Sequence, residues 1–188
     1  MQVIETKLSG VLIVEPDVYR DGRGFFFESY NTRRFAEHGI TDTFVQDNHS
    51  KSVAGVVRGL HYQVAPGQAK LVRVAVGEVY DVAVDIRWGS PTFGQWVGVI
   101  LSAENCRQLY VPVGFAHGFC VTSKVAEFLY KVTSYYSPQA ERGIAWDDPD
   151  LAIDWPAEHA ILSERDQRHP RLAEADRDYV YGADGANR

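Results

Sequence analysis

Short stretches in which apolar and polar residues alternate dominate the chain, and this period of two predicts β-strands. Valines occupy every second position of residues 72–76, Gly77 interrupts the pattern, and apolar residues return at every second position of residues 80–86. Successive side chains of a strand point to opposite faces, so each segment has one apolar face. We therefore predict a pair of strands broken at Gly77.

Further strands are predicted at residues 95–101, 108–113, 117–122 and 127–133. Turn signals recur roughly every 8 to 12 residues, a spacing typical of a β-sandwich or barrel. One helix is predicted before the last third of the chain, where Asn31 or Thr32 can cap residues 33–38 and Gly39 can end them. Residues 163–166 (SERD) can cap a second short helix.

The composition of the chain restricts the class of protein further. A chain of 188 residues, 45% apolar and 23% charged, suits one globular domain. The net charge of −6 argues against a general affinity for nucleic acid or for an anionic membrane. No apolar run reaches the length of about 18 residues needed to span a membrane. The two cysteines, Cys106 and Cys120, are too few for a disulfide framework, so we expect a cytoplasmic protein.

Polar residues crowd into the otherwise apolar region from residue 44 to residue 63, which contains Gln46, Asn48, His49, Lys51, Arg58 and His61. Polar groups at this density predict a ligand cavity. Simple alternation would place Arg58 and His61 on opposite faces of a strand. A bulge or bend at Gly59 would bring both side chains to the cavity.

The histidines do not follow the pattern of a metal site. His117 follows a turn and could be a metal ligand, but metal-binding barrels commonly need two closely spaced histidines and a carboxylate. Here Tyr62 and Gln63 follow His61, and Lys70 lies where a carboxylate would be useful. A cation at that position would repel a metal, so we predict a site without metal.

Other polar residues allow two interpretations on sequence alone. In residues 21–29, two glycines flank Arg23 and precede three phenylalanines and Glu28, without the pattern of a phosphate loop. This segment is either a turn before a buried strand or an exposed arginine beside an aromatic face for a nucleotide. Tyr130 is either a core tyrosine or a functional one, and Asp166 alone indicates little.

Several motifs together resemble one family. They are GRGFFFESYN, FVQDNHSKS, RGLHYQ, KLVRVAVGEVYDVAVDIR, SPTFGQW, LSAEN, GFAHGF, AEFLYK and LSERD, and the resemblance covers about residues 3 to 170. The family is that of the dTDP-4-dehydrorhamnose 3,5-epimerases. The resemblance implies a cupin-like jelly roll with a few short peripheral helices, assembled as a homodimer. It also implies inversion of carbons 3 and 5 of dTDP-4-keto-6-deoxyglucose through enolates, with no metal and no other cofactor.

The resemblance also assigns catalytic roles. His61 matches the general base, Asp166 the carboxylate that orients it, and Lys70 the cation that stabilises the enolate oxygen. Tyr130 matches the acid on the opposite face of the sugar. Asp166 follows His61 by 105 residues, so the two can meet only if the C-terminal segment (about 138–188) of the expected single domain (residues 1–188) folds back over the barrel.

Residues that match the family's nucleotide-sugar contacts are Arg23, Phe26, Glu28, Gln46, Asn48, Arg58, Lys70, His117, Tyr135, Glu141 and Arg165. Arg23 and Arg58 suit the diphosphate, because guanidinium groups bind phosphate oxygens in a forked geometry. Phe26 and Tyr135 suit packing on thymine or sugar. Arg165 lies where the family often has lysine, so the positive charge is kept at this position.

Three alternatives stay open at this point. The first is an epimerase acting at carbon 3 only, or a keto-sugar isomerase, of another deoxysugar pathway. The second is a metal-dependent cupin oxygenase, and the third is a sugar-binding cupin without activity. The presence of both His61 and Tyr130 favours inversion at both carbons.

Overall fold

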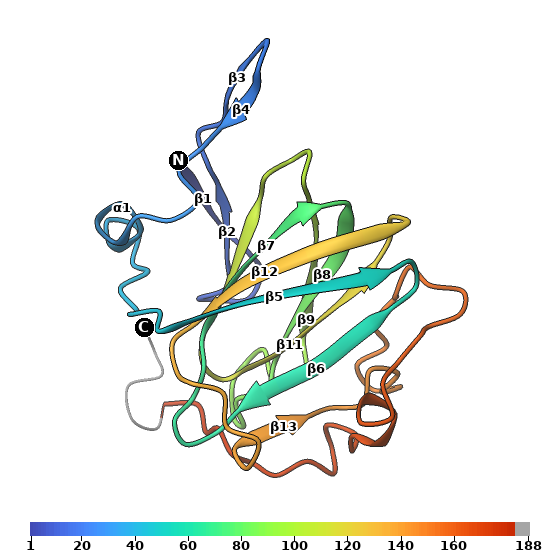
Figure 1. Cartoon of the computed structure of the whole chain (residues 1–188). Helices are drawn as coiled ribbons and strands as arrows, with labels where there is room; N and C mark the ends of the chain where they lie inside the picture. Colours follow the sequence, from blue (N-terminus) through green and yellow to red (C-terminus); the bar gives the residue numbers. More distant parts are fainter. Residues whose placement is uncertain (183–188) are drawn as a thin grey trace.

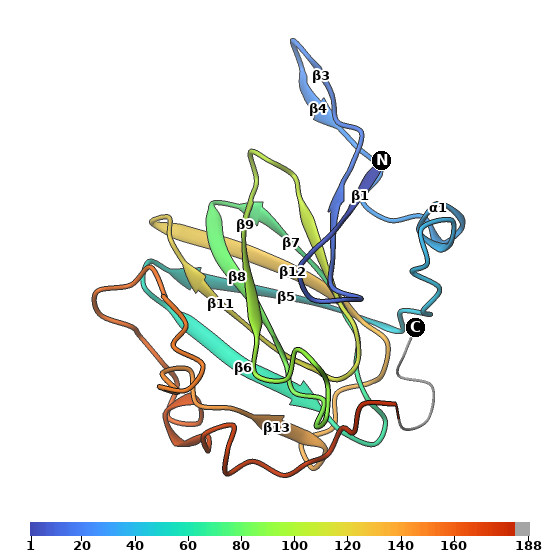
Figure 2. The same cartoon turned by 180° about the vertical axis from the view of Figure 1, so that it is seen from behind.

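The computed structural model describes residues 1–182, and strands dominate it (Figures 1 and 2). The six-stranded antiparallel sheet has the order β1 (Gln2–Glu5), β2 (Leu12–Glu15), β10 (Gln108–Val111), β7 (Lys70–Val76), β12 (Val125–Val132) and β5 (Gln46–Val53). The five-stranded antiparallel sheet has the order β13 (Glu141–Gly143), β6 (Val57–Gln63), β11 (Phe115–Val121), β8 (Glu78–Asp85) and β9 (Trp96–Ser102). The two sheets face each other, which confirms the predicted mainly β fold.

The remaining elements are small. β3 (Tyr19–Asp21) and β4 (Gly24–Phe26) form a ribbon that projects from the body of the protein (Figure 1). The predicted helix is present as α1 (Thr32–Ala36), and its cap is Asn31, whose side chain accepts from two backbone N–H groups. Residues Asp166–Arg168 form a single 3-10 turn, η1. Across residues 1–182, no helix is long and apolar enough to cross a membrane.

The predicted pairing of the strands on either side of Gly77 is wrong. β7 pairs with β10 and β12, whereas β8 pairs with β11 and β9 in the other sheet. Gly77 has a φ of +75°, and a Cβ there would lie 2.0 Å from the carbonyl oxygen of Val125. Glycine therefore lets the chain cross from one sheet to the other where a side chain would collide with the backbone.

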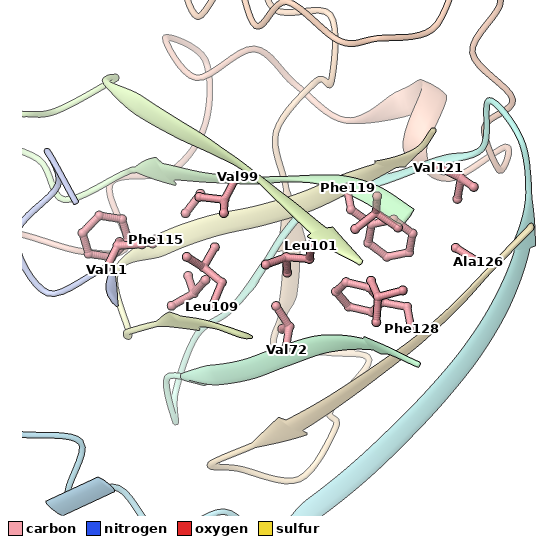
Figure 3. Close-up of a cluster of buried hydrophobic side chains, with 14 of the residues drawn as sticks. Val11, Val72, Val99, Leu101, Leu109, Phe115, Phe119, Val121, Ala126 and Phe128 are labelled. Atoms are coloured by element: carbon pink, nitrogen blue, oxygen red, sulfur yellow. The ribbon is translucent and has the colours of Figure 1, made fainter. Parts of the chain in front are cut away.

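An apolar core holds the two sheets together (Figure 3). Val72, Leu109 and Phe128 of the six-stranded sheet pack against residues of the opposite sheet that include Leu101 and Phe119. The rings of Phe119 and Phe128 stack with centroids 4.2 Å apart. Each fully buried side chain of this size contributes about 1.5–3 kcal/mol. Phe119 and Phe128 also line the cavity described below, so the core forms one of its walls.

The C-terminal segment covers the outer face of the five-stranded sheet. Val82 and Val84 of β8 pack there against a cluster that includes Trp155, and Trp96 Nε1 donates to the carbonyl oxygen of Leu151 at 2.8 Å. Both faces of β8 are therefore buried. These contacts support the predicted single domain, in which the C-terminal segment folds over the barrel. The last residues of that segment, 183–188, lie outside the described part of the chain.

Candidate active site

A cavity of about 740 Å³ lies between the two sheets. Its volume is within the range of small-molecule sites. Strands of both sheets line it, together with the segment around residues 161–166. The residues predicted from sequence that line it are Gln46, Asn48, Arg58, His61, Lys70, His117, Tyr130, Glu141, Arg165 and Asp166. Residues from distant parts of the chain thus meet in one place.

His61 and Asp166 form a hydrogen-bonded pair at one wall of the cavity. His61 lies on β6 and Asp166 begins η1, and His61 Nε2 lies 2.6 Å from Asp166 Oδ1. Ser163 fixes the turn, because its Oγ accepts from the backbone N–H of Asp166. Burial would raise the pKa of Asp166, but the neighbouring His169 and His61 outweigh it and hold that pKa below its ordinary value.

The state of Asp166 fixes the tautomer of His61. An ionised carboxylate only accepts hydrogen bonds, so His61 Nε2 carries the proton and Nδ1 is the free base. Burial lowers the pKa of His61, which favours the neutral ring, while Asp166 acts in the opposite direction. A neutral imidazole held by a carboxylate is suited to removing a proton and to stabilising the resulting imidazolium.

Lys70 places a cation in the floor of the cavity. It begins β7, its side chain is buried, and its Nζ donates to the backbone carbonyl of His61 at 3.2 Å. Burial lowers the pKa of Lys70 to about 8, against the opposing effect of Asp81 and Glu141. The ammonium form still predominates at pH 7, so Lys70 can stabilise a negative oxygen in the cavity.

Asp81 is a residue of the site that sequence reasoning missed. His117 on β11 has its Nε2 2.9 Å from Asp81 Oδ1 on β8, and both side chains are buried. Burial raises the pKa of Asp81, while His117 and Lys70 counteract this. An aspartate in the middle of an apolar strand was the available signal, because such residues are seldom fully buried without a partner.

Tyr130 reaches the cavity from the sheet opposite to His61. It lies on β12, paired in register with Asn48 of β5 and Val72 of β7. Burial raises the pKa of its hydroxyl, with Arg58 acting in the opposite direction. A phenol that stays protonated can donate a proton, and its position on the other sheet separates it from the imidazole of His61.

The predicted bend at Gly59 is confirmed. His61 pairs with His117 and Arg58 pairs with Phe119, so the register shifts between them. Gly59 has a φ of +124°, and a Cβ there would lie 2.5 Å from the Cα of Gly118. The irregular backbone directs both Arg58 and His61 to the cavity.

Charged and aromatic groups surround another part of the cavity. Arg165 forms an ion pair with Glu141 of β13, and the hydroxyl of Tyr136 donates to the same carboxylate at 2.9 Å. Tyr136 lines the cavity, whereas its neighbour Tyr135, the residue singled out from sequence, is 72% exposed and does not.

Besides Tyr135, three predicted binding residues lie outside this cavity. Arg23 and Phe26 are on the β3–β4 ribbon, and Glu28 follows it. Phe26 is 70% exposed, so the alternative of a buried strand at this position is wrong. Arg23 is paired with Asp21, and Glu28 accepts from Arg34. Within one chain, the fold does not bring these side chains to His61.

Three possible metal ligands meet beside the cavity. His61, Asp166 and His169 each offer an atom, and these atoms lie within 4.8 Å of one another. The positive charges of Lys70 and Arg165 act on His61 and oppose a cation there. The prediction of a site without metal therefore stays a prediction, with a physical reason in its favour.

Known proteins of one family resemble this chain over most of its length. A sequence model described as dTDP-4-dehydrorhamnose 3,5-epimerase matches residues 5–174. The chain is 60% identical to the dTDP-4-dehydrorhamnose 3,5-epimerase of Salmonella typhimurium, covering 93% of this chain and 97% of the relative. It is 57% identical to the enzyme of that name from Pseudomonas aeruginosa, covering 94% and 98%.

A solved structure extends the likeness to the fold. The dTDP-6-deoxy-D-glucose-3,5-epimerase of Legionella pneumophila, crystallised with dTDP-4-keto-L-rhamnose, superimposes with a TM-score of 0.94 at 55% identity. The match covers 97% of this chain and 99% of that one. The cupin-like fold implied by the sequence motifs is thereby confirmed. The family model, the relatives and the shared fold show that the chain belongs to the dTDP-4-dehydrorhamnose 3,5-epimerase family.

Proposed function

We propose that this cavity inverts carbons 3 and 5 of dTDP-4-dehydro-6-deoxy-D-glucose and yields dTDP-4-dehydro-L-rhamnose. The observation that carries the proposal is the placement of His61 and Tyr130 on opposite sheets around one cavity. Inversion needs a base on one face of the sugar and an acid on the other, because a proton returned to its original face restores the starting isomer. The site offers one group of each kind.

Each inversion is one proton out and one proton in. Nδ1 of His61 takes the proton from the carbon next to the C4 carbonyl, and the C–H electron pair forms the enolate. The hydroxyl of Tyr130 then protonates that carbon from the other face, while the carbonyl re-forms. Exchange with water removes the proton from His61 and returns one to Tyr130. The keto group makes both neighbouring C–H bonds acidic, so the proposed proton transfers require no cofactor.

Lys70 stabilises the enolate. Its ammonium group is buried in the cavity floor beside the His61 backbone, where a negative charge on the C4 oxygen interacts with it strongly. The buried His117–Asp81 pair adjoins this position. Asp166 holds His61 in the tautomer that leaves Nδ1 free.

The nucleotide is bound by the remaining polar lining. Arg58 and Arg165 offer forked donors for the diphosphate, and Gln46 and Asn48 offer amides that already contact each other at 2.9 Å. Glu141 orients Arg165. Tyr136, rather than its neighbour Tyr135, is the tyrosine at this part of the cavity.

A homodimer explains why Arg23, Phe26 and Glu28, on or next to the β3–β4 ribbon, lie outside the cavity of their own chain. The β3–β4 ribbon projects from the body of the protein (Figures 1 and 2). It exposes Tyr19, Phe25 and Phe26, and such an exposed apolar patch is unfavourable for an isolated protomer. In the proposed dimer, the ribbon of one protomer packs on its partner and brings Arg23 and Phe26 to the partner's cavity. The same exchange occurs in the opposite direction, as two-fold symmetry requires.

Mixing inactive variants tests this dimer. Arg23→Ala and His61→Asn homodimers each lack a complete site. If the ribbon serves the partner's cavity, the mixed dimer has one intact site, and an equal mixture recovers about a quarter of the wild-type rate. If the ribbon serves its own cavity, mixing restores nothing. Light scattering checks the dimer itself.

The reaction is tested by NMR of dTDP-4-keto-6-deoxyglucose with the enzyme in deuterated buffer, with a coupled reductase that traps the L-sugar. We expect deuterium at carbons 3 and 5 and trapped dTDP-L-rhamnose. Exchange at carbon 3 alone would assign the chain to a 3-epimerase of another deoxysugar pathway. Absence of exchange at both carbons would refute the proposed activity.

A further inference from the structure

His169 is a buried imidazole with no role in the reaction described so far. It follows η1 directly, and its side chain is only 13% exposed. Its Nε2 is inaccessible to solvent and has no hydrogen-bond partner in residues 1–182. A buried polar nitrogen without a partner costs about 1–3 kcal/mol, so its position needs an explanation.

The unpartnered nitrogen lies next to the catalytic pair. His169 Nε2 is 3.6 Å from Asp166 Oδ1, the oxygen that also contacts His61 Nε2 at 2.6 Å. The rings of His61 and His169 meet edge to face, with centroids 5.5 Å apart and planes at 78°. Asp166 therefore has two imidazoles around a single carboxylate oxygen.

The surrounding backbone leaves room for this ring. Gly143 of β13 lies opposite His61 in the sheet register. A Cβ at Gly143 would lie 2.4 Å from Cε1 and Nε2 of His169. The chain after His169 is also fixed, because the backbone N–H of Ala145 donates to the carbonyl of Pro170 at 2.7 Å. The ring thus occupies a space that any side chain at position 143 would fill.

We propose that His169 is a positioning residue, whose Nε2–H donates to Asp166 as a second donor and holds the carboxylate ionised against His61. The proposal rests on the function proposed above. Because an ionised carboxylate only accepts hydrogen bonds, the nitrogen that faces it must carry the proton. Hydrogen bonds of a catalytic site are often long in the absence of substrate, so the 3.6 Å separation between His169 Nε2 and Asp166 Oδ1 is compatible with this role.

The second donor tunes the basicity of His61. A second donor to Asp166 reduces the negative charge on the oxygen that accepts from His61. Asp166 then stabilises the imidazolium form of His61 less strongly, so the pKa of His61 is lower than it would be without the donor. Removing the donor makes Asp166 a stronger acceptor and raises the pKa of His61. The other charged groups that act on His61 are Lys70 and Arg165, the latter paired with Glu141, and they are unchanged in the variants below.

Three variants separate positioning from space filling. His169→Phe fills the space without a donor, His169→Gln restores an N–H donor, and Gly143→Ala displaces the ring while leaving His169 in the chain. The exposed His159→Phe serves as the matched control. The readouts are the His61 pKa of the substrate-free enzyme, from NMR titration of its ring, and the pH profile of kcat/KM.

We expect His169→Phe and Gly143→Ala to raise the His61 pKa, and the acid limb of kcat/KM with it, by roughly half a pH unit. We expect kcat to fall about fivefold with KM unchanged. His169→Gln and His159→Phe should stay near wild type. If His169→Phe does not fold, Gly143→Ala carries the test.

An unchanged His61 pKa in both His169→Phe and Gly143→Ala would overturn the proposal, because a structural ring would not affect that titration. Equal losses in His169→Gln and His169→Phe would overturn it as well. The titration needs no substrate, so it remains decisive even if the wild type exchanges no deuterium and the proposed reaction fails.

Discussion

Replacing Lys70 by methionine should make the protein more stable and almost inactive. The side chain is buried, and burial lowers its pKa from 10.5 to about 8. That difference corresponds to about 3 kcal/mol of folding free energy lost at neutral pH in keeping the ammonium charged. Methionine has a similar length and no charge, so the variant should unfold at a higher temperature and a higher urea concentration.

The stability difference between wild type and Lys70→Met should depend on pH. The pKa of Lys70 is lower in the folded state than in the unfolded state, so the destabilisation is complete below pH 8. It disappears as the pH rises from about 8 to about 10.5, because the unfolded chain then loses its proton too. The advantage of Lys70→Met should therefore shrink over this range. Urea unfolding at a fixed protein concentration, at several pH values, measures it.

Catalysis should change in the opposite direction. A charge about 4 Å from the enolate oxygen contributes about 4 kcal/mol at an effective dielectric constant of 20, equivalent to about a thousandfold in rate. Lys51→Met, which removes an exposed lysine paired with Glu127, is the control and should change stability by less than about 0.5 kcal/mol. A Lys70→Met protein that is less stable than wild type at every pH would show that the buried ammonium group does not destabilise the fold.

Three further predictions concern the same cavity. His61→Asn should abolish deuterium exchange at both carbons while dTDP binding, measured by calorimetry, stays close to wild type; wild-type turnover would remove His61 from its role. Tyr130→Phe should still exchange protons but should impair inversion, most visibly at carbon 5; equal loss of exchange and inversion at both carbons would make Tyr130 a positioning residue. Gly59→Ala should lower the free energy of unfolding, measured with urea, by at least about 2 kcal/mol, because residue 59 has a φ of +124° and a Cβ there would collide with Gly118. An unchanged urea midpoint would contradict the described bend.

Local patterns were sufficient for most elements of the fold. Alternation located β9, β10, β11 and β12, because a strand buried on at least one face must place apolar residues at every second position. The Asn31 cap and the bend at Gly59 were also readable, since both depend on the conformational preferences of single residues. The pairing across Gly77 was not readable, because two neighbouring strands can join one sheet or two with the same alternation.

The site likewise has features that were readable from the sequence and features that were not. The kinds of side chain in the site were readable from the chain, since His61, Lys70, Tyr130 and Asp166 lie in motifs that identify the family. Their neighbours became visible only in three dimensions: Asp81 behind His117, His169 beside Asp166, Tyr136 in place of Tyr135, and the ribbon with Arg23 outside the cavity of its own chain. The physical reason is that hydrogen bonding and charge act over a few ångströms in space, whereas these residues are brought within that range by the packing of two sheets and a folded-back C-terminal segment.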